Sequence, residues 1–221
     1  MQMNSSLASS EVIESDHPQI LELTRNIVGS AQSSFERATK LFYFVRETVK
    51  YDPFSPFFLK EHYKTTGILE RGRGYCVQKA VVLVTLARAL GIPAQLVFAD
   101  IRNYKASSRM VRLMGTNLFV WHGYARLKLG GRWVKVAPTF EQKLCEENGF
   151  PVVEFDGKND AVFPALHGSG GKFIEYVKRH GSFDDLPLDL ILQGWEEAYG
   201  VEKVNLWMEA IESGRVTNFE I

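Results

Sequence analysis

A single cysteine stands where an apolar helix is expected to begin. The stretch "RGRGYCVQKAVVLVTLARALGIP", residues 71–93, places Cys76 between a glycine-rich approach and a run that is apolar on nearly every side. A thiol at a helix N-terminus faces unpaired backbone N–H groups and the positive end of the helix dipole, and both favour the thiolate. The position therefore predicts a lowered thiol pKa and a nucleophile whose oxyanion the same N–H groups could receive. The alternative role is that of a small apolar residue closing the helix.

A histidine on a predicted hairpin could act as the base for this thiol. The stretches "LFVWHGYARLKL" and "RWVKVAPTF" flank Gly130-Gly131, a pair that is typical of a two-residue hairpin turn. This turn pairs His122 with Thr139 and puts residue 137 on the same face as His122, at a diagonal distance of roughly 7–8 Å. A carboxylate there could orient the imidazole, but the residue is Ala137. The alternative role of His122 is that of a core histidine whose hydrogen bonds are satisfied.

Two helices should support these residues. In "SSFERATKLFYFVRETVKY", Ser33 and Glu36 match a capping box, and the apolar residues that follow have helical spacing. This helix should end near Tyr51, because two prolines come directly after it. The helix that follows the cysteine should lie inside the protein and end at Gly91 and Pro93.

Strands and further helices complete the predicted pattern. Strands are expected at 94–101, 118–129 and 132–140, and the stretch 151–157 could add another. The polar stretch 102–117 is predicted to be a loop or an irregular helix. Two helices should follow at the C-terminus, the first with Asp185 as its N-cap and Pro187 in its first turn, the second in "EKVNLWMEAIESG". Helices, then an antiparallel sheet, then helices indicate an α+β fold.

Four ordered segments together resemble the transglutaminase-like superfamily, whose fold is similar to that of papain-type cysteine peptidases. They read "GRGYC", "RALGIPA", "WHGYARL" and "GRWVKVAPTF", and the preceding "VKYDPF" looks like the same region of bacterial and archaeal members. The resemblance covers residues 35–140 well and the rest weakly. It implies N-terminal helices, a cysteine-bearing central helix packed on an antiparallel sheet, and a helical C-terminus.

The resemblance also implies roles for individual residues. Carried over by position, Cys76 would be the nucleophile and His122 its base, while the family's aspartate falls on Ala137. In such a triad the acid fixes the histidine tautomer and stabilises the imidazolium. Its loss leaves three possibilities: Thr139 supplies an oxygen to the ring, another carboxylate such as Glu141 or Asp156 reaches in, or the site is inactive. A cysteine nucleophile depends on the acid less than a serine does.

Other residues could contribute to the same site. Tyr51, Gly74 and Tyr75 are candidates for the oxyanion site or the cleft walls, with packing as the alternative role of Tyr51. Cys145 lies in a polar stretch that we expect to be exposed, where it is either incidental or a resolving thiol. His167, in a glycine-rich loop, is either a gate beside the cleft or a solvated loop residue.

Composition excludes several classes of function. The net charge is zero and no basic cluster occurs, so a nucleic-acid partner is not expected. The longest uncharged apolar run, Ala80 to Ala87, is far too short to cross a membrane. No secretory signal begins the sequence and its two cysteines make no disulfide framework, so a cytoplasmic location is expected. No metal or organic cofactor is predicted. Residues 1–17 should form a flexible arm and residues 18–221 a single domain.

The expected function is thiol acyl chemistry on a peptide or amide substrate. Resolution of the thioester by water would make the protein a peptidase or amidase, and resolution by an amine would make it a transglutaminase. A second hypothesis is a transglutaminase-like binding or scaffold module that has lost catalysis. A third is an acyltransferase of the same broad fold that accepts acyl groups from a thioester donor.

Overall fold

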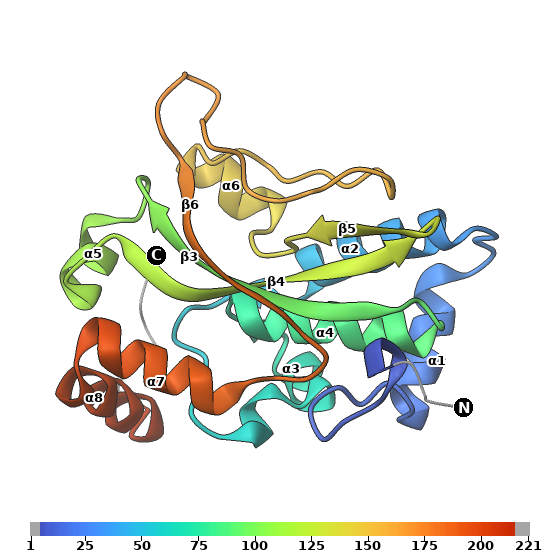
Figure 1. The fold of residues 1–221 in the computed structure, drawn as a ribbon, viewed down its shortest axis with the longest axis horizontal. Helices are drawn as coiled ribbons and strands as arrows, with labels where there is room; N and C mark the ends of the chain where they lie inside the picture. The colour runs from blue at the N-terminus through green and yellow to red at the C-terminus, as the bar shows by residue number, and fades with distance from the viewer. Residues whose placement is uncertain (1–4, 215–221) are drawn as a thin grey trace.

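Four antiparallel strands in the order β5-β4-β3-β6 form the sheet on which the histidine lies. A computed structural model describes residues 5–214 (Figure 1). The strands of this sheet are β3 Ala94–Asn103, β4 Leu118–Leu129, β5 Arg132–Val136 and β6 Ile174–Phe183, and a small parallel pair is formed by β1 Lys50–Tyr51 and β2 Arg73–Gly74. The α-helices are α1 Pro18–Val28, α2 Ser34–Thr48, α3 Thr65–Arg71, α4 Cys76–Ala89, α5 Ser108–Met114, α6 Gln142–Asn148, α7 Leu188–Tyr199 and α8 Val201–Glu212. The fold is α+β, as the sequence predicts.

The two helices that should support the site form where they are expected. Helix α2 has Ser33 as its N-cap, and the Ser33 hydroxyl accepts from the Glu36 N–H while the Glu36 carboxylate accepts from the Ser33 N–H. Helix α4 begins at Cys76, and Gly91 follows its end with a positive φ of 71°. The sequence therefore determines both boundaries through local chemistry alone.

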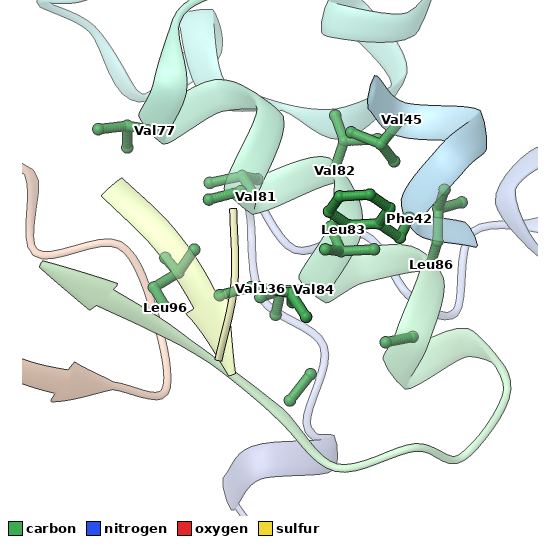
Figure 2. Packing of buried hydrophobic residues seen from close by; sticks show 14 of the residues in the cluster. Phe42, Val45, Val77, Val81, Val82, Leu83, Val84, Leu86, Leu96 and Val136 are labelled. Atoms are coloured by element: carbon green, nitrogen blue, oxygen red, sulfur yellow. The ribbon is translucent and has the colours of Figure 1, made fainter. Parts of the chain in front are cut away.

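Helix α4 is buried between α2 and the sheet. Figure 2 shows Phe42 and Val45 of α2 on one side of α4, with Leu96 and Val136 of the sheet on another. The apolar side chains of α4 from Val77 to Ala87 are 0% exposed. Burial of each such side chain contributes about 1.5–3 kcal/mol, so the position of the helix, and of its first residue, is strongly held.

The predicted hairpin forms, but it is shorter than expected. Gly130 and Gly131 have φ of 55° and 83°, which a turn of this kind requires, and the strands pair in the predicted register. The ladder ends at Val136, because the Ala137 N–H donates to the carbonyl of Ala161 instead of continuing along β4. The expected ladder pair of His122 and Thr139 is therefore wrong.

Other expectations about local structure are also corrected. Residues 151–157 form no strand, and the fourth strand is instead β6, whose polar sequence hides it. Helices α1, α3 and α6 were not predicted. The N-cap of α7 is Pro187, because the Asp185 carboxylate accepts from the Ser10 hydroxyl and from the adjacent Leu186 N–H.

The N-terminal segment is docked rather than loose. Val12 and Ile13 are 3% and 0% exposed and belong to the main core, so residues 5–17 pack against the rest of the chain. The Arg88 guanidinium reinforces this by donating to the Ala8 carbonyl. The first four residues of the expected arm lie outside the described part.

Candidate active site

Cys76 and His122 line the same pocket, whose volume is about 250 Å³. Tyr51, Tyr75 and Thr139 also line it. The structure thus brings the proposed nucleophile and the proposed base into one cavity with three of the residues that the sequence nominated around them, and the other five lie outside its lining.

A glycine beside the histidine allows β4 to touch the start of α4. A Cβ on Gly123 would lie 2.8 Å from the Val77 Cα, which is closer than any real side chain tolerates. Val77 follows Cys76 and Gly123 follows His122, so this contact packs the first turn of α4 against the part of β4 that carries His122. The motif "WHGY" therefore needs its glycine for packing rather than for a turn.

Substituting Gly123 should be costly. The variant Gly123→Ala places a methyl group against the Val77 backbone, and overpacking of this kind lowers the free energy of unfolding by about 1–3 kcal/mol. Urea denaturation measures the change. Gly168→Ala is the matched control, since no atom lies within 4 Å of the added carbon, and equal stabilities for both variants would contradict the close contact.

A β-bulge in β4 comes directly before His122. Asp100 of β3 lies opposite two residues of β4, Val120 and Trp121, because the register shifts between Ala99 and its neighbours. Trp121 has a φ of 57°, which is rare for a residue with a side chain. Because side chains alternate along a strand, the extra residue decides which face of the sheet carries His122.

A buried polar pair holds this bulge in place. The Asp100 carboxylate accepts from the Trp121 N–H at 3.0 Å and lies 2.6 Å from the His180 Nε2 of β6. The Trp121 and His180 rings stack with centroids 4.1 Å apart and an interplanar angle of 8°. Sequence reasoning missed this group, because β6 was not predicted and the pairing of Asp100 with His180 depends on it.

Removing the carboxylate of this pair should loosen the bulge. Asp100→Ala leaves the Trp121 N–H without its acceptor in a buried position, which costs about 1–3 kcal/mol of stability. The near-ultraviolet circular dichroism of the stacked tryptophan should weaken at the same time. Asp16→Ala, at an exposed position, is the control, and a variant of Asp100 that unfolds with wild-type stability would refute the role.

The thiol pKa shifts in the direction opposite to the prediction. Burial raises the pKa of Cys76 to about 11, although hydrogen bonding from the Gly123 and Val77 backbone N–H groups favours the thiolate. Burial also lowers the pKa of His122 to about 3. Loss of water therefore outweighs the helix N-terminus, and the resting pair is a neutral thiol and a neutral imidazole at pH 7.

One nitrogen of the imidazole has no partner. His122 Nε2 is buried without a hydrogen bond to any described residue. Around the ring are Phe163, at a centroid distance of 5.4 Å, Tyr124 at 6.1 Å, and the paired Ala99. Ala99 and Tyr124 form a small apolar cluster with Ala137, which is 0% exposed. The surroundings of the imidazole on the side of this cluster are therefore apolar.

The nominated substitutes for the acid are placed differently. Thr139 is buried, and its hydroxyl has no hydrogen-bond partner among residues 5–214, so no bond joins it to the imidazole. Glu141 accepts from the Tyr51 N–H at 3.0 Å and lies 3.8 Å from the buried Lys79 Nζ. Asp156 is exposed and accepts from the N–H groups of its own loop. Neither carboxylate bonds to His122.

The residues before the cysteine are fixed by a buried glutamine. Gln78 Oε1 accepts from the Tyr75 N–H at 3.2 Å, and its Nε2 donates to the carbonyls of Pro56 and His62. Gly74 is buried outside the pocket, where a Cβ would meet Gln78 at 3.0 Å. Gln78 thus holds the path of the chain into α4.

Two further sequence candidates lie away from the pocket. Cys145 is on α6 and only 1% exposed, so the expectation of an exposed thiol is wrong: it is the buried residue of an otherwise polar helix. His167 accepts from or donates to the Ser169 hydroxyl at 2.8 Å within its own loop. Neither residue lines the cavity that holds Cys76.

Between residues 5 and 214, no group of three or more histidine, cysteine, aspartate or glutamate side chains could hold a metal ion. None of the described helices is long and apolar enough to cross a membrane.

A cysteine-initiated helix packed on an antiparallel sheet, with a histidine strand against its first turn, defines a papain-like arrangement. Residues 21–138, more than half of the chain, match the family described as the transglutaminase-like superfamily. The chain therefore belongs to the transglutaminase-like superfamily. No curated protein sequence matches it.

Several solved structures are similar to parts of the chain. A "putative cysteine protease" from Cytophaga hutchinsonii shares 19% identity over 61% of this chain and 40% of its own, with a TM-score of 0.47. A "putative protease" from Parabacteroides distasonis shares 10% identity over 60% of this chain and 26% of its own, with a TM-score of 0.40. A "TGase" shares 19% identity over 55% of this chain and 30% of its own, with a TM-score of 0.35. The chain spans well under half the length of each.

Proposed function

We propose that the protein carries out thiol-dependent acyl chemistry on an amide. The Cys76 sulfur attacks the carbonyl carbon while His122 takes the thiol proton, and the C–N bond then breaks as His122 protonates the leaving amine. This leaves a thioester on Cys76. Water or an amine then attacks the thioester, releases the acid or a new amide, and returns the proton to the sulfur.

The observation that carries this proposal is the shared pocket of Cys76 and His122 at the start of α4. The first-turn N–H groups of the helix, together with the Gly123 N–H, favour negative charge at that point. The neutral resting pair supports proton transfer during attack, as in serine hydrolases, rather than a preformed ion pair.

Intact mass spectrometry tests the proposal directly. The protein is incubated with 4-nitrophenyl esters, acyl thioesters and glutamine-containing peptides, with and without a labelled primary amine. Acyl adducts should form on wild type and on Cys145→Ala but not on Cys76→Ala, and His122→Gln should slow them by about 10²–10⁴-fold. Acylation that survives in Cys76→Ala would overturn the proposal. Turnover of the labelled amine separates transfer from hydrolysis.

A catalytically inactive binding module is the second candidate. The apolar surroundings of the unpartnered His122 Nε2 favour it, because nothing there stabilises an imidazolium. A folded wild-type protein that forms no adduct with any of these donors would count against the first candidate and in favour of this one.

A further inference from the structure

The walls of the Cys76 pocket are hydrocarbon. Two helices that lie at the same end of the sheet supply a large part of them (Figure 1). From α5 and α8 these residues are Met110, Leu113, Met114, Trp207, Ala210 and Ile211. Phe119, Phe150 and Trp195 add aromatic surface from other elements. Apart from a few polar side chains, among them Asn103, Ser107 and Asn148, a substrate would therefore contact carbon.

Charges are nearly absent from the same walls. Among the described residues that line the pocket, none is a carboxylate, and Lys105, which is exposed, is the one ammonium group. A protonated amine inside the pocket would thus lose water without gaining an anionic partner, which is costly. This composition favours an uncharged group next to the reacting carbonyl.

A polar contact joins the two helical walls. The Lys203 ammonium of α8 donates to the carbonyl of Met114, the last residue of α5, at 3.1 Å. Leu113 is half-buried and α5 contains no buried residue, so the apolar side chains of α5 line the pocket and do not pack into the core. A hydrocarbon guest would bury the surface that the core leaves uncovered.

From these observations we infer that the site takes an uncharged acyl compound whose acyl group is a bulky hydrocarbon chain. The inference rests on the proposed function for its reaction, but the binding itself needs no chemistry. The carbonyl would lie at Cys76, and the chain would run along Leu113 and Ala210 between α5 and α8. A cavity of about 250 Å³ is near the lower end of ligand pockets, which suits a medium-length chain rather than a polypeptide.

Binding of simple amides to Cys76→Ala protein tests the inference without catalysis. Butanamide, hexanamide and octanamide are titrated while tryptophan fluorescence is followed, since Trp195 and Trp207 line the pocket. Each added methylene should tighten binding about fourfold, which gives on the order of 10²-fold between the shortest and the longest amide. The charged isostere 5-aminopentanamide should bind more weakly than hexanamide.

Two substitutions locate the binding. Leu113→Asn should weaken octanamide binding at least tenfold, and Ala210→Trp should shift the preference toward butanamide by filling the channel. Leu206→Asn, on α8 but 62% exposed and outside the pocket, is the matched control and should leave binding unchanged. Affinity that does not depend on chain length, or equal loss in the control, would overturn the inference.

The two proposals fail separately. Octanamide binding that responds to Leu113→Asn, with no adduct on wild-type Cys76 from an octanoyl ester, would retain the hydrocarbon pocket and remove the acyl chemistry. Adducts that form equally well from acetyl and octanoyl esters, with no chain-length effect on binding, would retain the chemistry and remove the hydrocarbon pocket.

Discussion

Replacing Ala137 with aspartate should make Cys76 more reactive at pH 7 by about 10²–10⁴-fold, the range over which an orienting acid and a competent base act. The imidazole of His122 has a buried Nε2 with no partner, and its apolar neighbours include the cluster that contains Ala137. A carboxylate introduced there would accept from Nε2 and favour the imidazolium, which raises the pKa of His122 and draws the thiol proton to it. The rate of alkylation by iodoacetamide at pH 7 measures the change.

The control variant separates charge from hydrogen bonding. Ala137→Asn has nearly the shape of the aspartate and an oxygen that can accept from Nε2, but it lacks the charge that stabilises an imidazolium. It should therefore increase the rate of alkylation of Cys76 much less than the aspartate variant does. Because residue 137 is fully buried, the unfolding transition of each variant is measured in parallel. A folded Ala137→Asp protein whose Cys76 reacts no faster than wild type would show that the missing acid does not limit reactivity.

Local chemistry is the part of this fold that the sequence predicts well. The capping box at Ser33, the start of α4 at Cys76 and the Gly130-Gly131 turn each depend on residues that are neighbours in the chain. A capping hydroxyl or a paired glycine turn has nearly the same effect in any fold, so these positions need no knowledge of tertiary structure.

The parts that were missed depend on contacts between distant segments. Strand β6 has a polar sequence and is recognised by its pairing with β3 rather than by its own pattern. Without β6, the sequence gives no reason to place His180 next to Asp100. The β-bulge before His122, which this pair holds, therefore cannot be predicted either. The hairpin register likewise ends early because Ala161, far along the chain, takes the Ala137 N–H.

The thiol pKa is the sharpest case of this kind. A helix N-terminus is a local feature, and alone it predicts a lowered pKa for Cys76. Burial is a property of the whole fold, and here it has the larger effect and the opposite sign for both the thiol and the imidazole. A carboxylate beside the imidazole would alter that balance, and the apolar neighbours of His122 leave it unopposed.

The reactivity of Cys76 should consequently rise steeply with pH and without a plateau below pH 10. With a pKa of about 11, the thiolate fraction is on the order of 10⁻⁴ at pH 7 and grows tenfold with each pH unit, so alkylation should speed up about 10³-fold between pH 7 and pH 10. His122, with a pKa of about 3, stays neutral throughout and adds no inflection. Iodoacetamide kinetics on Cys145→Ala protein report Cys76 alone, with circular dichroism at each pH to verify that the fold persists.

Two companion variants give the pH profile its meaning. His122→Gln should keep the wild-type profile, because a neutral imidazole contributes no charge to the thiolate, whereas Ala137→Asp should bring the rise to lower pH by creating one. A wild-type plateau below pH 8 would instead require a thiolate–imidazolium pair at rest. In that event Cys76 and His122 would be ionised although they are buried among apolar side chains. A group other than residue 137 would then have to stabilise the charge on the imidazolium.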